Sequence, residues 1–251
     1  MDLKLKGKGV IVTGASSGIG RAIALEFANE GANLAICARG REALEKTCSE
    51  LEAKGVKAYA QVCDVSDRIA LNQFLESAKS SLLQIDVLIN NAPGWGVSDD
   101  ETGWARSFSV DIMASVRASW KVAPWMEDHG GGAIIHVSSI AGMEAGWAPP
   151  YAAAKAALIS HAKTMANNLA PKGIRVNCVA LGSIEFPGGR WEETKQSNPQ
   201  WYEAIHRSIP FGRLGTPEEV AVAVVFLSSS RASWISGITL AVDGVQHKGN
   251  L

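Results

Sequence analysis

Short apolar runs alternate with amphipathic runs along the whole chain, and this alternation restricts the possible folds most strongly. The apolar runs are β-branched and show no regular exchange of polar and apolar residues, which is typical of strands buried on both faces. They cover residues 9–14, 33–38, 56–65, 86–92, 132–139, 174–181 and 237–244. A repeated strand–helix–strand order predicts parallel strands joined by right-handed crossovers. We therefore expect an α/β fold in one domain over residues 1–251, with a doubly wound sheet of about seven parallel strands and helices on both faces.

The runs between the strands carry helix signals. Residues 21–31 and 41–55 are amphipathic, and Gly31 supplies a stop for the first of them. Residues 216–227 begin with Thr216, then Pro217, and Glu219 follows three places after the threonine. This spacing predicts a capping box at the start of a helix.

Composition excludes several classes of protein. A formal net charge of −1 gives no electrostatic basis for binding nucleic acid or an anionic membrane. The longest apolar run near the start covers only residues 10–12, which is too short for a signal or a membrane span. The four cysteines are scattered without a CxxC, and no HExxH occurs, so we expect no metal site, reduced thiols and a cytoplasmic location.

A glycine-rich turn follows the first predicted strand. Residues 13–20 read T-G-A-S-S-G-I-G and lead directly into a predicted helix. Glycines at these places permit a tight turn and a close approach of backbone to a phosphate. The N–H groups and the dipole at the helix start favour a pyrophosphate. The turn therefore predicts a dinucleotide site beyond the first strand.

The same letters permit a second interpretation, because residues 14–18 also match G-x-S-x-G, the nucleophile elbow of the α/β-hydrolases. A hydrolase would use Ser16, an acid and a late histidine such as His247. That elbow lies well inside its sheet, whereas only one predicted strand precedes Ser16 here. We keep the hydrolase as the less favoured alternative.

One of only three tyrosines stands at the start of an alanine-rich helix, with a lysine four places on. Tyr151 and Lys155 therefore share one helix face. A free tyrosine has a pKa near 10, and a neighbouring ammonium group favours the tyrosinate form. The helix start, fixed by Pro149 and Pro150, acts in the same direction. We expect Tyr151 to exchange a proton with a substrate oxygen.

These motifs, taken together, resemble the short-chain dehydrogenase/reductase family along essentially the whole chain, and in particular its 3-oxoacyl-carrier-protein reductases and other ketoreductases. The matching segments are T-G-A-S-S-G-I-G (13–20), Asp64-Val65, Asn90-Asn91-Ala92, Ser139 with Tyr151 and Lys155, L-G-S-I-E-F-P-G-G (181–189), G-R-L-G-T-P-E-E-V-A (212–221) and L-A-V-D-G (240–244). The resemblance implies a Rossmann-type fold and hydride transfer between a nicotinamide cofactor and a ketone or alcohol.

The resemblance also assigns roles. Ser139, Tyr151 and Lys155 would be catalytic, and Asp111 stands where the family has its catalytic Asn. The cofactor residues implied are Gly14, Ser16, Ser17, Gly18, Ile19, Gly20, Arg39, Asp64, Val65, Asn90, Tyr151, Lys155 and Ile184. In the family an acidic residue at the end of the second strand holds the ribose of NAD, but here Ala38 and then Arg39 occupy this place. Because a guanidinium grips a 2′-phosphate, we favour NADP(H) over NAD(H). We interpret Arg41 as a solvent-exposed residue at the start of a helix.

Several positions depart from the family pattern. Asp111 replaces an amide by a carboxylate next to Lys155, and either substitutes for the amide or indicates altered activity. Ser139 matches the family's strand-end position, whereas Ser138 has the usual thirteen-residue separation from Tyr151; we favour Ser139. Further departures are Pro93, Leu181, Phe186 and Val245. A non-catalytic nucleotide-binding sensor or scaffold therefore remains a second alternative.

Residues 182–214 form a long stretch without a predicted strand, and we interpret them as a lid over the substrate. Its aromatic residues, with Trp95 and Trp147 from other loops, predict an apolar pocket for a bulky or cyclic ketone. The apolar run 220–227 exceeds the need of one buried face and suggests a homo-oligomer, a dimer or tetramer.

Overall fold

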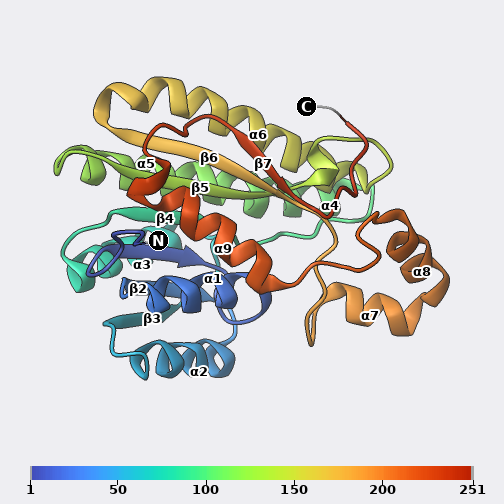
Figure 1. The fold of residues 1–251 in the computed structure, drawn as a ribbon, viewed down its shortest axis with the longest axis horizontal. Coiled ribbons are helices and arrows are strands. Elements are labelled where there is room, and N and C mark those ends of the chain that lie inside the picture. Colours follow the sequence, from blue (N-terminus) through green and yellow to red (C-terminus); the bar gives the residue numbers. More distant parts are fainter. Residues whose placement is uncertain (1, 250–251) are drawn as a thin grey trace.

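The computed structural model describes residues 2–249 and contains one seven-stranded sheet (Figure 1). Every strand pair is parallel, and the order is β3-β2-β1-β4-β5-β6-β7. The strands are β1 (Gly9–Thr13), β2 (Asn33–Ala38), β3 (Ala58–Val62), β4 (Val87–Asn90), β5 (Gly132–Ser139), β6 (Ile174–Leu181) and β7 (Thr239–Val242). The predicted fold class is confirmed. All seven predicted strands form, and β2, β5 and β6 have the predicted bounds.

Helices occupy the connections between strands. They are α1 (Gly18–Asn29), α2 (Arg41–Glu52), α3 (Arg68–Leu82), α4 (Glu101–Ser107), the π-helix η1 (Phe108–Ala114), α5 (Ser115–Glu127), α6 (Pro149–Leu169), α7 (Arg190–Ser197), α8 (Pro199–Ser208) and α9 (Pro217–Ser228), with 3-10 turns η2 (Ile140–Gly142), η3 (Ala170–Lys172) and η4 (Ser230–Ala232). The predicted capping box of α9 forms: Thr216 Oγ1 accepts the Glu219 N–H, and Glu219 Oε2 accepts the Thr216 N–H. None of the helices in residues 2–249 has the length and apolar character needed to cross a membrane.

Successive strand residues face opposite sides of the sheet, so each strand supplies two cores. On one side Val10 and Val12 pack in a cluster with residues of α1, α2 and α9. On the other side Ile11 lies in a cluster with residues of α3, α5 and α6. Helices cover both faces of the sheet. This explains why the strands are apolar without a regular alternation of polar and apolar residues.

The winding of the chain reverses between β1 and β4. From β1 the chain proceeds outward to β2 and β3, then crosses back to β4, which lies on the other side of β1. In such sheets the ligand crevice opens beyond the carboxyl ends of the strands at this reversal. The glycine turn follows β1 and Asn91 follows β4, so both lie at this point.

Two features differ from expectation. The predicted lid is not a plain loop: it contains α7 and α8, which pack together at one end of the molecule (Figure 1). The apolar run 220–227 lies in α9, where Val220, Val224 and Val225 are buried in the core and the helix packs against α1. Only Val222 in this run is strongly exposed. The run is therefore explained by the protein's own core and gives no separate support for a subunit interface.

Candidate active site

The glycine turn is held tightly against the ends of its neighbouring strands. The N–H groups of Gly14 and Ala15 bond the Cys37 carbonyl at 2.8 and 3.1 Å. Gly14 has φ +70°, and a Cβ there would lie 2.8 Å from the Ala92 Cα. A Cβ on Gly20 would lie 2.2 Å from the Gly14 carbonyl oxygen. Only glycine fits at these two positions, so the turn can fold back on itself.

The start of α1 offers free hydrogen-bond donors to a ligand. Ser17 is the N-cap, is exposed and forms no side-chain cap bond, so the first N–H groups of α1 have no side-chain acceptor. Ser16 is half-buried next to it and Ile19 packs on the core. Such a helix start fits a pyrophosphate. A Cβ on Gly18 would lie 2.4 Å from the ring of Phe186, so this aromatic residue of the predicted lid covers the turn.

The ends of β2 and β3 border the same crevice. Arg39 is exposed after β2 and forms no ion pair among residues 2–249, whereas Arg41 pairs with Glu45 at 3.1 Å, as expected for a solvated helix start. Val65 is buried. Asp64 accepts the side-chain and backbone hydrogen bonds of Ser66, which lower the pKa of this carboxyl group. An ionised Asp64 is thereby fixed at the edge of the crevice.

The side chains of Asn90 and Asn91 turn inward rather than toward a ligand. Asn90 Nδ2 lies 3.3 Å from Ser119 Oγ and 3.1 Å from His136 Nδ1. Asn91 Nδ2 donates to the carbonyls of Thr13 and Gly14 and so supports the glycine turn. Only the backbone of Asn90 is left to contact a cofactor.

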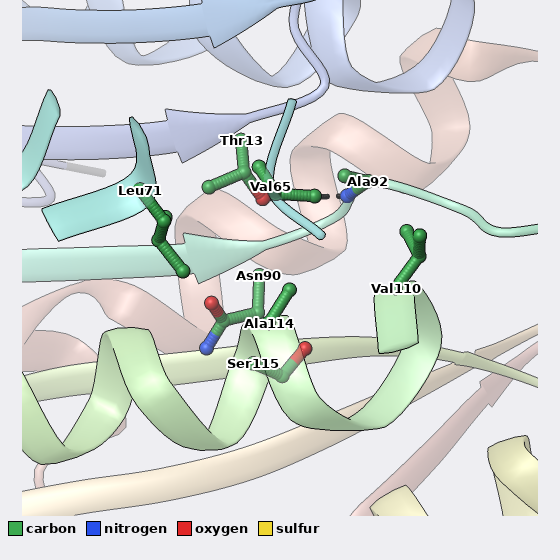
Figure 2. A pocket seen from close by; sticks show the side chains of 8 residues that line it. All are labelled: Thr13, Val65, Leu71, Asn90, Ala92, Val110, Ala114 and Ser115. Carbon is green, nitrogen blue, oxygen red and sulfur yellow. Dashed lines mark hydrogen bonds between the residues drawn. The ribbon is translucent and has the colours of Figure 1, made fainter. Parts of the chain in front are cut away.

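Figure 2 shows the side chains that line a small pocket at the ends of β1 and β4. Its lining residues are Thr13, Val65, Leu71, Asn90, Ala92, Val110, Ala114 and Ser115. Thr13 Oγ1 accepts the Ala92 N–H here and ties β1 to the loop after β4. Val65 and Asn90, two of the predicted cofactor residues, thus line one pocket. Ile184, a third, is buried and pairs with Gly215 at the base of the predicted lid.

Tyr151 lies in the first turn of α6, behind Pro149 and Pro150, and Lys155 follows one turn later. The Lys155 Nζ lies 3.0 Å from the Val137 carbonyl oxygen and 5.5 Å from the centre of the Tyr151 ring. It also lies 3.1 Å from Asp111 Oδ1 in an ion pair whose side chains are 4% and 0% exposed. Burial by itself lowers the pKa of Lys155, but the Asp111 carboxylate outweighs burial and the pKa is raised. The ammonium form of Lys155 is therefore stabilised.

Asp111 is placed by the π-helix η1, which joins α4 to α5. Its Oδ1 also accepts the Gly94 N–H at 3.1 Å. Its Oδ2 is buried and has no hydrogen-bond partner among the described residues. The carboxylate thus binds the lysine and the loop after β4 with one oxygen and keeps the other free. Single-turn π-helices are frequent at functional sites.

The two candidate serines have different surroundings. Ser139 ends β5, is half-buried, donates to the Leu181 carbonyl at 3.4 Å and accepts the Ala141 N–H at 3.2 Å. Ser138 is buried and donates to the Lys155 carbonyl at 3.0 Å. The Ser139 hydroxyl acts on the Tyr151 phenol and lowers its pKa. The geometry therefore brings Ser139, Tyr151, Lys155 and Asp111 together, with Ser138 behind them.

The net pKa shift of Tyr151 is opposite to the shift expected from the sequence. Lys155 lowers the pKa of the phenol as expected, but burial raises it more strongly, and Asp111 also raises it. The expectation of an acidic tyrosine is therefore wrong for the protein without ligands. Burial disfavours the charged tyrosinate, and Asp111 offsets part of the lysine's charge.

Sequence reasoning did not foresee the contact that buries Tyr151. The Trp95 indole stacks on the phenol with ring centres 4.9 Å apart and planes at 12°. Trp95 has φ +52°, a left-handed conformation that is unusual for a bulky residue. The Asp111 bond to Gly94 and a bond from Ser107 Oγ to the Gly96 carbonyl fix the loop on both sides of it. The glycines on both sides of Trp95 were the sequence feature that could have indicated this unusual loop conformation.

The aromatic residues of the predicted lid have mixed roles. Trp147 and Trp191 pack against a small cluster of Tyr202, Ile205, Ile209 and Leu214. Trp201 and Phe211 are exposed. About half of these aromatic side chains therefore hold α7 and α8 in place rather than line the crevice.

The residues of a serine hydrolase are not assembled. His247 Nδ1 pairs with Asp243 just after β7. Ser16 follows β1, and β4, β5 and β6 lie between β1 and β7. Since neighbouring strands lie about 4.8 Å apart, this histidine is far beyond reach of Ser16.

Comparisons with known proteins agree with this geometry. The family profile described as enoyl-(acyl carrier protein) reductase matches residues 14–245. Isoepoxydon dehydrogenase patN of Penicillium expansum is 36% identical over 250 residues, which cover 98% of this chain and 96% of that protein. The crystal structure of L-sorbose reductase from Gluconobacter frateurii with NADPH and L-sorbose has a TM-score of 0.90 and 35% identity, covering 99% of this chain and 100% of that chain. A 7α-hydroxysteroid dehydrogenase with NADH and 7-oxo glycochenodeoxycholic acid has a TM-score of 0.90 and 34% identity, covering 97% and 96%.

Proposed function

The chain belongs to the short-chain dehydrogenase/reductase family, and we propose that it is an NADP(H)-dependent oxidoreductase that interconverts a ketone and a secondary alcohol. Relatives that are dehydrogenases and reductases support an oxidoreductase acting on a carbonyl or hydroxyl group. One observation supports the proposal most strongly: Ser139 and the buried pair of Lys155 and Asp111 are grouped around Tyr151.

The bound cofactor supplies the hydride, and the protein supplies the proton. Ser139 would hydrogen-bond the carbonyl oxygen and hold it near Tyr151. Because its pKa is raised, Tyr151 is protonated at neutral pH and can donate its phenolic proton as the substrate oxygen becomes basic. In the oxidation direction the phenol must first lose that proton, which its burial opposes. The site is therefore better prepared for reduction than for oxidation.

Lys155 and Asp111 act on the phenol through charge. The ammonium group favours the tyrosinate left after proton donation, and Asp111 holds the ammonium in position. The free Oδ2 of Asp111 can accept a hydrogen bond from a relay water, as the family's amide would through its oxygen. Asp111 therefore substitutes for the amide as a positioning residue.

The choice of NADP(H) rests on charge at the end of β2. Arg39 is exposed and not ion-paired among the described residues, and no carboxylate follows Ala38 to repel a 2′-phosphate. The neighbours use both cofactors, since one was solved with NADPH and another with NADH. The guanidinium, suited to bidentate binding of phosphate, supports NADP(H) for this chain.

The aromatic side chains near Tyr151 support a bulky or cyclic ketone as substrate, held under a lid formed by residues 182–214. Trp95 stacks on Tyr151, and the Phe186 ring lies against Gly18 of the glycine turn. We also expect a homo-oligomer, because large apolar side chains such as Trp120 and Trp234 are exposed. Light scattering of the purified protein tests that expectation.

A non-catalytic nucleotide-binding role is the second candidate, and the Trp95 ring that covers Tyr151 favours it. A panel of cyclic and linear ketones with NADPH and NADH, and of the matching alcohols with NADP and NAD, separates the two roles. Oxidation of NADPH by at least one ketone is expected. Tight NADPH binding with no turnover of any ketone or alcohol would establish the non-catalytic role.

A further inference from the structure

A cation stands over the aromatic cover of the catalytic phenol. Arg190, the first residue of α7, places its guanidinium carbon 5.2 Å from the centre of the Trp95 ring. Trp95 in turn stacks on Tyr151. The charge of Arg190 acts on the phenol and lowers its pKa. The predicted lid therefore brings a positive charge to the mouth of the site.

This guanidinium has no carboxylate of its own. Among residues 2–249 Arg190 forms no ion pair, and its side chain donates no hydrogen bond to another residue. The other cation on the same helix is different: Lys195 lies 5.0 Å from the Tyr202 ring centre and pairs with Glu185 at 3.8 Å. Arg190 is thus oriented by an aromatic ring while all its donors remain available.

We propose that Arg190, oriented by Trp95, binds an anionic substituent, a carboxylate, on the ketone or alcohol that reacts at Tyr151. The inference rests on the proposed function and names the class of substrate: a cyclic, largely apolar compound with one carboxylate. A guanidinium binds a carboxylate through two parallel hydrogen bonds, which gives orientation as well as affinity. The apolar part of the same molecule would pack against the aromatic edges beside Tyr151.

The stacking distances limit the size of this substrate. Arg190 lies 5.2 Å from the Trp95 ring centre, and that ring centre lies 4.9 Å from the one of Tyr151. Both groups therefore lie close to one indole ring, so a substrate that contacts both groups is a compact molecule.

The test uses two probes, 4-oxocyclohexanecarboxylate and its methyl ester, in which one methyl group replaces the negative charge. Calorimetric titration into the full-length protein, with and without NADPH, measures binding without requiring turnover. The wild-type protein is expected to bind the acid at least about tenfold more tightly than the ester. Arg190→Gln should abolish this preference, and Arg190→Lys should restore only part of it because an ammonium lacks the paired donors. Lys195→Gln, which removes the same charge from α7, should leave the preference intact.

Three other outcomes would overturn the inference. Equal binding of acid and ester by the wild-type protein would exclude a carboxylate subsite. Loss of the preference in Lys195→Gln as well would indicate general attraction by the charge of α7. A weaker NADPH affinity in Arg190→Gln, with the acid preference kept, would assign Arg190 to the cofactor phosphates. Charge-selective binding without any NADPH oxidation would support the subsite and contradict the proposed reaction instead.

Discussion

The Lys155 Nζ lies 3.1 Å from Asp111 Oδ1, and both side chains are almost fully buried. A buried ion pair keeps both partners charged, because either one alone would be expensive to bury. Lys155 therefore acts on Tyr151 as a permanent cation, while Asp111 partly cancels its field at the phenol. The strength with which this site stabilises tyrosinate is set by the balance of these two charges.

Asp111→Asn should move the pH profile of alcohol oxidation to lower pH. Asp111 raises the pKa of Tyr151, so its removal lowers that pKa and the tyrosinate needed for oxidation forms at lower pH. An asparagine oxygen can still accept the Gly94 N–H, so the loop stays in place. The measurement is kcat/KM for oxidation between pH 6 and 10. A profile that stays in place or moves to higher pH would contradict the assigned balance of charges.

Ser139→Ala should reduce kcat/KM for ketone reduction by about 10²- to 10³-fold, since it removes a donor to the substrate oxygen. Ser138→Ala is the matched control: its hydroxyl bonds the Lys155 carbonyl inside the core, so its loss should cost about 1 kcal/mol of stability with much less effect on turnover. Steady-state kinetics and urea unfolding of both variants make the comparison. The reverse pattern would move the catalytic role to Ser138.

Arg39→Gln should weaken NADPH binding by about 10- to 100-fold and leave NADH binding nearly unchanged, because only NADPH carries the 2′-phosphate. Arg41→Gln removes a neighbouring cation that already pairs with Glu45, so it should alter neither affinity. Fluorescence titration of each cofactor gives the dissociation constants. Equal weakening of NADPH and NADH in Arg39→Gln would mean that Arg39 contacts the adenine or ribose rather than the phosphate.

His136 should make the protein sensitive to acid. Burial, together with the charges of His161 and Lys155, lowers the pKa of His136 to about 3. Because the unfolded chain takes up this proton near pH 6.5, stability falls as the pH drops from about 6.5 toward 3. Between pH 7 and pH 5 the free energy of unfolding should fall by about 2 kcal/mol from this residue alone. In urea titrations His136→Gln should show a clearly smaller fall; an unchanged fall would assign the sensitivity to other groups.

The sequence was sufficient for the fold where local patterns and tertiary packing agree. The bounds of β2, β5 and β6 follow from predominantly apolar runs, and the cap of α9 follows from Thr216 and Glu219. The helices α7 and α8 escaped prediction because both are short and bury few residues, none in α7 and two in α8. Their order depends on aromatic contacts made after folding.

The candidate site could be predicted as a set of residues but not as a balance of charges. The spacing of Tyr151 and Lys155 places both on one helix face, yet it contains no information on burial. Trp95 reaches the phenol only through a left-handed backbone conformation, which no periodicity encodes. The direction of the Tyr151 pKa shift depends on that cover and on Asp111, which lies forty residues earlier in the chain.

Replacement of Tyr151 by phenylalanine tests the central claim most directly. NADPH oxidation by the best ketone of the panel should fall by about 10²- to 10⁴-fold, because the proton donor is lost. The stacking on Trp95 needs only the ring, so folding and the dissociation constant for NADPH should remain as in the wild-type protein. A Tyr151→Phe variant that binds NADPH normally and reduces the ketone at the wild-type rate would contradict the account.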